Sequence, residues 1–80
     1  MKDKIITILK EIRPEFDFTK ENLNFIDEGM LDSFDVVTLV TTLDKEYNIS
    51  IDGLDIVPDN FSSIDSIEAL LKKNGVNDEP

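Results

Sequence analysis

Three segments of the chain repeat apolar residues at the three- and four-residue spacing that places them on one side of an α-helix. The first predicted helix covers residues 3–13 and stops before Pro14, because the residue preceding a proline is pushed away from helical geometry. The second predicted helix covers about residues 33–47, and the last covers about residues 63–73. Their buried stripes are predicted to be Ile5, Ile8, Leu9 and Ile12, then Val36, Leu39, Val40, Leu43 and Tyr47, and finally Ile64, Ile67, Leu70 and Leu71.

The two segments that join these helices differ in character. Residues 14–31 form a long connection without a sustained period, and a short helical turn is expected at residues 19–22. The segment 48–61 alternates apolar and polar residues briefly around an Asp52-Gly53 turn. This pattern is compatible with a short strand and with a short helix. Apolar residues in the first connection predict that it packs over the core: Phe16, Phe18, Leu23, Phe25, Ile26 and Leu31.

The expected fold is all-α: a small antiparallel four-helix bundle, with three main helices, a short third helix and a long loop between the first two. A chain of 80 residues buries only about 60% of the surface that its unfolded form exposes, so no deep catalytic cavity is expected. Residues 1–80 are predicted to form a single domain, with a core over about residues 3–73 and a flexible tail at residues 76–80.

The charge balance limits the partners. The chain has 18 acidic and 8 basic residues, which disfavours nucleic acid and anionic membrane surfaces and favours a protein with a basic patch. The apolar stretch near the amino terminus is too short and too interrupted by charge for a signal or membrane segment, so a cytoplasmic monomer without membrane insertion is expected.

The residues offer little for catalysis. The chain has no histidine and no cysteine, and Lys45 would lie roughly 18 Å along the helix from Ser33, so Ser33 has no general base. Neither acidic loop has the ligand spacing of a calcium loop, and no glycine-rich phosphate loop or transition-metal cluster is present. We therefore expect no catalytic residue, no metal site and no enzyme activity.

The stretch "DEGMLDSFDVVTLV", residues 27–40, places Ser33 at the start of the second predicted helix. Asp32 is the predicted N-cap, with Asp35 at the third helical position. Ser33 is then exposed at the positive end of the helix dipole, which favours a phosphodiester. The alternative is an unmodified serine that opens a helix. Facing away from the core on the same helix are Phe34, Thr38, Thr41 and Lys45.

The stretch "GMLDSFDVVTLVTTLDKEYNISI" resembles the second helix of the acyl carrier protein family, including the stand-alone aminoacyl and peptidyl carriers. The shared signature is an Asp-Ser pair followed by a large apolar residue, here Asp32-Ser33-Phe34, after a long loop. The resemblance extends over nearly the whole chain, because the order of elements and the closing "FSSIDSIEALLKK" also follow the family.

The resemblance implies a covalent cofactor. A phosphopantetheinyl transferase would use coenzyme A to attach 4′-phosphopantetheine to Ser33 through a phosphodiester, making the chain a phosphoprotein. The thiol of this arm would carry an acyl or aminoacyl group as a thioester for partner enzymes, in fatty acid or nonribosomal peptide biosynthesis. Asp32 matches the acidic residue before the attachment serine, and Asp35 matches a position that helps the modifying enzyme to dock.

The outward face of the second helix departs from fatty-acid carriers, which resemble one another in having glutamates there. Thr38, Thr41 and Lys45 in their place favour an adenylating ligase as the loading enzyme, as in the D-alanyl and peptidyl carrier branch. Phe34 is open to two interpretations, a partner contact or a partly buried ring against the preceding loop. The residues predicted to recognise partners are Phe34, Asp35, Val37, Thr38, Thr41 and Lys45.

A second class of function is an acidic helical adaptor that binds a basic protein surface without a covalent cofactor. Asp32, Asp35 and Asp44 would then be the contacts, and Ser33→Ala would hardly affect function.

Overall fold

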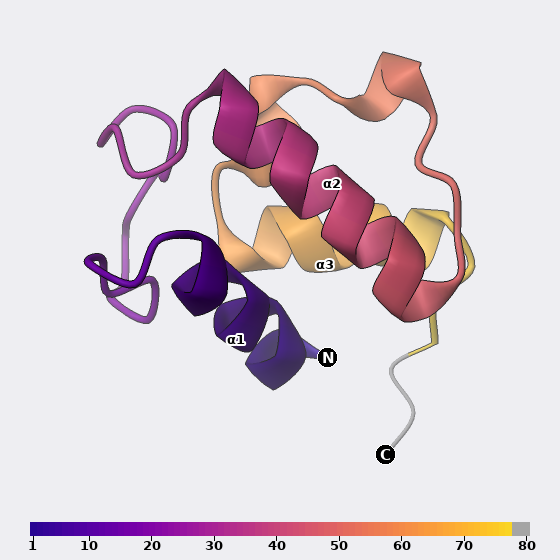
Figure 1. The fold of residues 1–80 in the computed structure, drawn as a ribbon, viewed down its shortest axis with the longest axis horizontal. Coiled ribbons are helices and arrows are strands. Elements are labelled where there is room, and N and C mark those ends of the chain that lie inside the picture. Colours follow the sequence, from indigo (N-terminus) through magenta and orange to yellow (C-terminus); the bar gives the residue numbers. More distant parts are fainter. Residues whose placement is uncertain (78–80) are drawn as a thin grey trace.

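The computed structural model describes residues 1–77, which form three α-helices joined by loops, with no strand among them (Figure 1). The helix α1 spans Lys2–Ile12, α2 spans Ser33–Tyr47 and α3 spans Ile64–Lys73. Two short 3₁₀-helices follow α2: η1 at Gly53–Asp55 and η2 at Pro58–Phe61. α1 packs against both other α-helices, and η2 packs against α3.

The all-α prediction is confirmed, with a change in the segment 48–61. A strand there is wrong, and the expected short third helix is divided into η1 and η2. Asp52 is the N-cap of η1, and its carboxylate accepts a hydrogen bond from the Leu54 backbone N–H at 2.9 Å. Pro58 opens η2, where a missing N–H costs nothing. Residues 78–80, which belong to the tail expected to be flexible, lie outside the described residues.

The core lies between the three helices and the long loop. Phe18 and Phe25, both from the loop, are almost fully buried and meet edge to face with ring centroids 5.0 Å apart. The Phe25 backbone N–H donates to the Ser62 carbonyl at 2.8 Å, which ties the loop to the segment before α3. The predicted packing of this loop over the core is therefore confirmed. Val36 and Tyr47, predicted as core, are only partly buried at its edge.

The helical turn in the long loop lies nearer α2 than predicted. The Asn24 side-chain oxygen accepts from the backbone N–H groups of Ile26 and Asp27, and the Glu28 N–H donates to the Asn24 carbonyl at 2.9 Å. Gly29 follows with a positive φ of 73°. An asparagine that bonds the backbone two and three residues ahead is a turn former, and here it acts at residues 24–28. Residues 19–22 form turns without an α- or 3₁₀-helix.

Gly29→Ala is expected to lower the free energy of unfolding by about 1 kcal/mol, because a side chain is strained at positive φ. Gly53→Ala is the matched control, since Gly53 does not have a positive φ and a Cβ would meet nothing within 4 Å. Urea unfolding of both variants measures the difference. An equal effect at the two positions would contradict this account of Gly29.

Candidate functional site

The start of α2 is closed by a reciprocal pair of hydrogen bonds. The Asp35 backbone N–H donates to Asp32 Oδ1 at 2.9 Å, and the Asp32 backbone N–H donates to Asp35 Oδ2 at 3.0 Å. Together they form a capping box, with Asp32 as the N-cap and Asp35 at the third helical position, as predicted. The serine between them is therefore not needed as the cap.

Arg13 joins this capping box to the end of α1. Its Nε donates to Asp35 Oδ2 at 2.8 Å, one terminal nitrogen lies 3.3 Å from Asp32 Oδ2, and the other lies 3.2 Å from Glu15 Oε2. The Asp35 side chain is only 13% exposed, so its carboxylate interacts within the molecule. Sequence reasoning missed Arg13. The available signal was that it is the single arginine of the chain and directly precedes Pro14.

These contacts shift the acid–base properties of the site. The Asp35 backbone N–H is the main cause that lowers the pKa of Asp32 below its ordinary value, and the positive charge of Arg13 adds to the effect. Hydrogen bonds to Asp35 and then to Glu15 raise the pKa of Arg13. Both shifts favour the charged forms, so Arg13 and Asp32 are ionised at neutral pH.

The lowered pKa of Asp32 predicts how stability depends on pH. A carboxyl whose folded pKa is lowered contributes stability above its ordinary value of 3.8 and loses it as pH falls through the folded pKa. Asp32→Asn keeps a capping side chain but removes the charge. We expect the wild type to be more stable than Asp32→Asn at neutral pH and the difference to disappear on acidification below the folded pKa. Urea midpoints across this range measure it, and a constant difference would contradict the prediction.

Ser33 is the first residue of α2, and its side chain is exposed. Within the described part of the chain its hydroxyl takes part in no hydrogen bond. A groove of about 400 Å³ lies beside it, between the start of α2 and the η1–η2 segment. The groove is mostly apolar, and besides Asp32 and Ser33 it is lined by Ile26, Leu31, Val36, Val37, Ile56, Val57 and Pro58.

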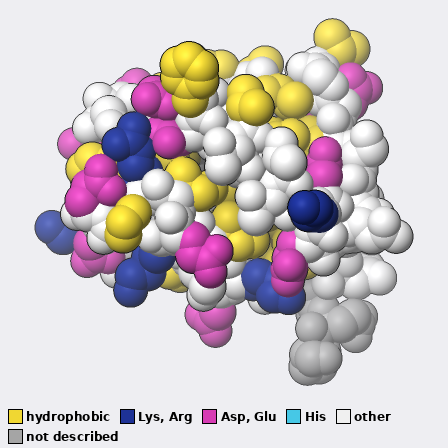
Figure 2. Space-filling model, in the orientation of Figure 1, with side chains coloured by type: hydrophobic (Ala, Val, Ile, Leu, Met, Phe, Trp, Pro, Cys, Tyr) yellow, Lys and Arg dark blue, Asp and Glu magenta, His cyan; other side chains and the backbone are white. Residues whose placement is uncertain are grey.

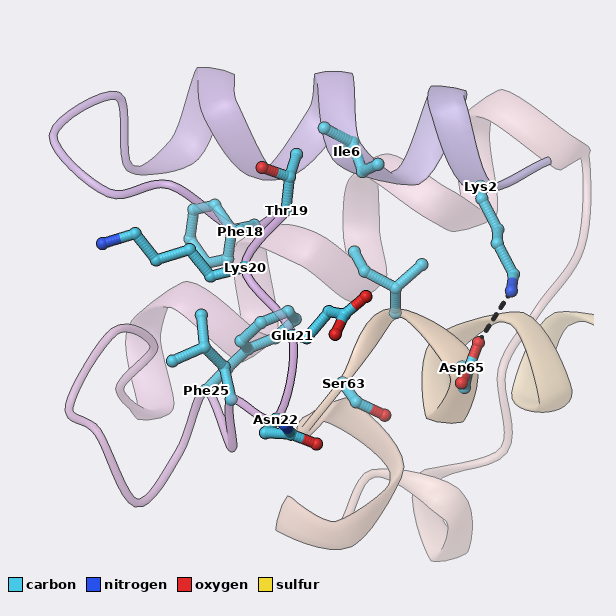
Figure 3. A pocket seen from close by; sticks show the side chains of 12 residues that line it. Lys2, Ile6, Phe18, Thr19, Lys20, Glu21, Asn22, Phe25, Ser63 and Asp65 are labelled. Atoms are coloured by element: carbon cyan, nitrogen blue, oxygen red, sulfur yellow. Dashed lines mark ion pairs between the residues drawn. The ribbon is translucent and has the colours of Figure 1, made fainter.

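A larger groove of about 510 Å³ lies elsewhere, between α1, the long loop and the start of α3 (Figure 3). It shares no lining residue with the groove beside Ser33, and the Lys2–Asp65 ion pair of 2.9 Å lies at one end of it. Its polar side chains include both signs of charge, among them Lys20 and Glu21. Size alone does not make it the functional groove, because the hydroxyl at the start of α2 is in the other one.

The outward face of α2, which we define as Phe34, Val37, Thr38, Thr41 and Lys45, is exposed. The helical wheel predicted this for all of them except Val37. The Phe34 side chain is 84% exposed, so the interpretation as a ring buried against the loop is wrong. Thr38 and Thr41 donate their hydroxyls to backbone carbonyls one turn back at 3.0 Å. This face therefore presents mainly carbon atoms. Asp35, the remaining residue predicted to recognise partners, lies apart from it in the capping box.

Exposed apolar residues continue this face onto the neighbouring segment. Leu54 is 86% exposed, and Ile56 and Val57 are 37% and 41% exposed. Figure 2 shows hydrophobic side chains gathered along the upper edge, where the start of α2 and the η1–η2 segment lie in Figure 1. Sequence reasoning missed these three residues, because an apolar residue in a short irregular segment is as easily part of the core.

The adaptor hypothesis fits the site less well. Asp35 contacts Asp32 and Arg13, and the Asp44 carboxylate accepts the Ile51 backbone N–H at 3.0 Å. Asp32 accepts the Asp35 backbone N–H and contacts Arg13, so all three carboxylates that an adaptor would present stabilise local structure.

The described residues contain no group of three or more His, Cys, Asp or Glu side chains that could hold a metal ion. None of the helices in residues 1–77 is long and apolar enough to cross a membrane.

A helical domain with an exposed hydroxyl at the start of a helix, outside the capping network, has the features of a carrier that other enzymes modify. A family model described as "phosphopantetheine attachment site" matches residues 3–71, and the chain belongs to this family. Its members are carrier domains that bind 4′-phosphopantetheine covalently and are not catalysts. The resemblance to acyl carrier proteins is thereby confirmed, while the branch stays a prediction. No curated protein and no solved structure matches the chain.

Proposed function

We propose that Ser33 carries the 4′-phosphopantetheine arm and that the chain delivers an acyl or aminoacyl cargo bound to that arm as a thioester. The observation that carries the proposal is the exposed Ser33 hydroxyl, which lies at the first position of α2 while Asp32 and Asp35 do the capping. The family match over residues 3–71 supports it.

Ser33 fits the chemistry of attachment. Its Oγ would attack the phosphorus of coenzyme A that bears the pantetheine, forming an O–P bond while the diphosphate bond breaks and adenosine 3′,5′-bisphosphate leaves. The serine proton would go to a base of the transferase, since the chain has no histidine. The backbone N–H groups at the start of α2 favour the resulting phosphodiester. When bound, the arm supplies the thiol for the thioester, which a chain without cysteine lacks.

The surface around Ser33 supports a partner that binds through apolar contact. The outward face of α2 has no carboxylate, and Leu54, Ile56 and Val57 continue it with exposed carbon surface. A basic patch would find no charge partner on this face. An adenylating ligase that recognises apolar surface is therefore the proposed loading enzyme, acting on a monomeric carrier in the cytoplasm.

The test is the intact mass of the purified protein after incubation with coenzyme A, magnesium and a broad-specificity phosphopantetheinyl transferase. We expect a gain of one phosphopantetheine group, located on the peptide that contains Ser33 by fragmentation. A known carrier in a parallel reaction shows that the transferase is active. An unchanged mass with an active transferase, or a gain on another peptide, would overturn the proposal.

A further inference from the structure

Arg13 lies 20 residues before Ser33, yet its guanidinium contacts the carboxylates on both sides of that serine. The Nε to Asp35 Oδ2 distance is 2.8 Å, and the terminal nitrogen is 3.3 Å from Asp32 Oδ2. The Arg13 side chain is 30% exposed and that of Asp35 is 13% exposed, so this pair is partly shielded from water. Shielded, hydrogen-bonded ion pairs are stronger than exposed ones.

Apart from Val36, which is partly buried against the core, the first turn of α2 has few other contacts that hold it. Ser33 and Phe34 are exposed, and the fully buried residues of α2 begin only at Leu39. The turn therefore depends on the capping box, in which two carboxylates lie close enough to share one guanidinium. Without that cation, the two negative charges would repel each other and the box would open more often.

We infer that Arg13 is a positioning residue for the modification of Ser33. By holding Asp32 and Asp35 together, it keeps the start of α2 folded, so that the transferase meets Ser33 in a formed helix. The inference rests on the proposed function of Ser33. It also gives Asp35 a role through the fold of α2, in place of direct contact with the modifying enzyme.

Arg13→Gln tests this, with Lys4→Gln as its matched control. Lys4 on α1 pairs with Glu46 near the end of α2 at 2.7 Å, whereas Arg13, which follows α1, pairs with carboxylates at the start of α2. Each variant therefore removes one positive charge and its ion pairing with one end of α2. Transferase kinetics are measured at a temperature where circular dichroism shows both variants folded. If Arg13→Gln does not fold, Arg13→Lys replaces it. The ammonium keeps the charge but loses the planar fork that contacts both carboxylates, so a smaller effect in the same direction is expected.

We expect the KM for the Arg13→Gln carrier to rise about fivefold with kcat unchanged, because a smaller fraction of the carrier has a formed first turn. Amide exchange of the Asp35 N–H, which donates within the capping box, should accelerate by more than this factor, because exchange follows the open fraction, which is small in the wild type. Lys4→Gln should change neither quantity. A purely structural role would instead affect both variants alike or act only near the unfolding temperature.

The outcomes separate the inference from the proposed function. If the wild type is modified and Arg13→Gln has the KM and exchange rate of Lys4→Gln, the inference fails and the function of Ser33 stands. A fall in kcat alone also overturns the inference. If the wild type accepts no phosphopantetheine, the proposed function fails and the inference fails with it.

Discussion

Ser33→Ala is expected to abolish phosphopantetheine attachment completely while changing the free energy of unfolding by less than about 0.5 kcal/mol. The attachment is lost because the substitution removes the oxygen that forms the phosphodiester. The stability is kept because Asp32 and Asp35 cap α2, and the Ser33 hydroxyl is exposed. Intact mass after the transferase reaction and a urea unfolding curve measure the two effects.

Ser63→Ala is the matched control, because it is the same substitution at the start of another helix. The Ser63 hydroxyl accepts the Ser66 backbone N–H at 3.0 Å and caps α3. Its removal should cost about 1 kcal/mol of stability and leave attachment intact. The two serines thus predict opposite results in the two measurements. Attachment to Ser33→Ala, or its loss from Ser63→Ala, would contradict the assignment.

The largest effect on stability is expected from Phe18→Ala. Phe18 is 1% exposed and packs edge to face with both Phe25 and Phe16, at centroid distances of 5.0 and 6.3 Å. Removing a buried phenyl ring costs about 3–5 kcal/mol, and a chain of 80 residues has a total stability of about 4–12 kcal/mol. The variant should therefore unfold at much lower urea concentration or be partly unfolded in water.

Phe34→Ala is the control for Phe18→Ala, since the same ring is removed from a side chain that is 84% exposed. Its free energy of unfolding should stay within about 0.5 kcal/mol of the wild type. Urea unfolding followed by circular dichroism compares the two variants. A small effect at Phe18 would show that the long loop contributes little to the core.

The helices could be predicted because their apolar spacing reflects the face that each buries. Leu39 and Leu43 on α2 are both fully buried, as their spacing indicated. The contacts of Arg13 could not be predicted in this way, because the ion pair with Asp35 joins residues 22 positions apart. Such a contact depends on how the long loop brings the end of α1 to the start of α2, and no local pattern encodes that.

The candidate site shows the same division. Asp32 as the N-cap and Phe34 on the outward face follow from local rules, and the structure has both. For Asp35, the sequence pattern predicted the position in the capping box. It did not predict that the side chain is partly buried and pairs with Arg13. The exposure of Leu54 was also beyond prediction, because it depends on how a short segment between two helices is oriented in three dimensions.

The threonines of the outward face have a thermodynamic consequence. Because the hydroxyls of Thr38 and Thr41 donate to carbonyls of their own helix, a protein covering this face does not have to replace lost hydrogen bonds to water at these donors. Most of the water released would come from methyl groups and the Phe34 ring. Such binding has a negative heat-capacity change and depends little on ionic strength. The net charge of −10 would then act on the rate at which a charged partner approaches more than on the contact with this face.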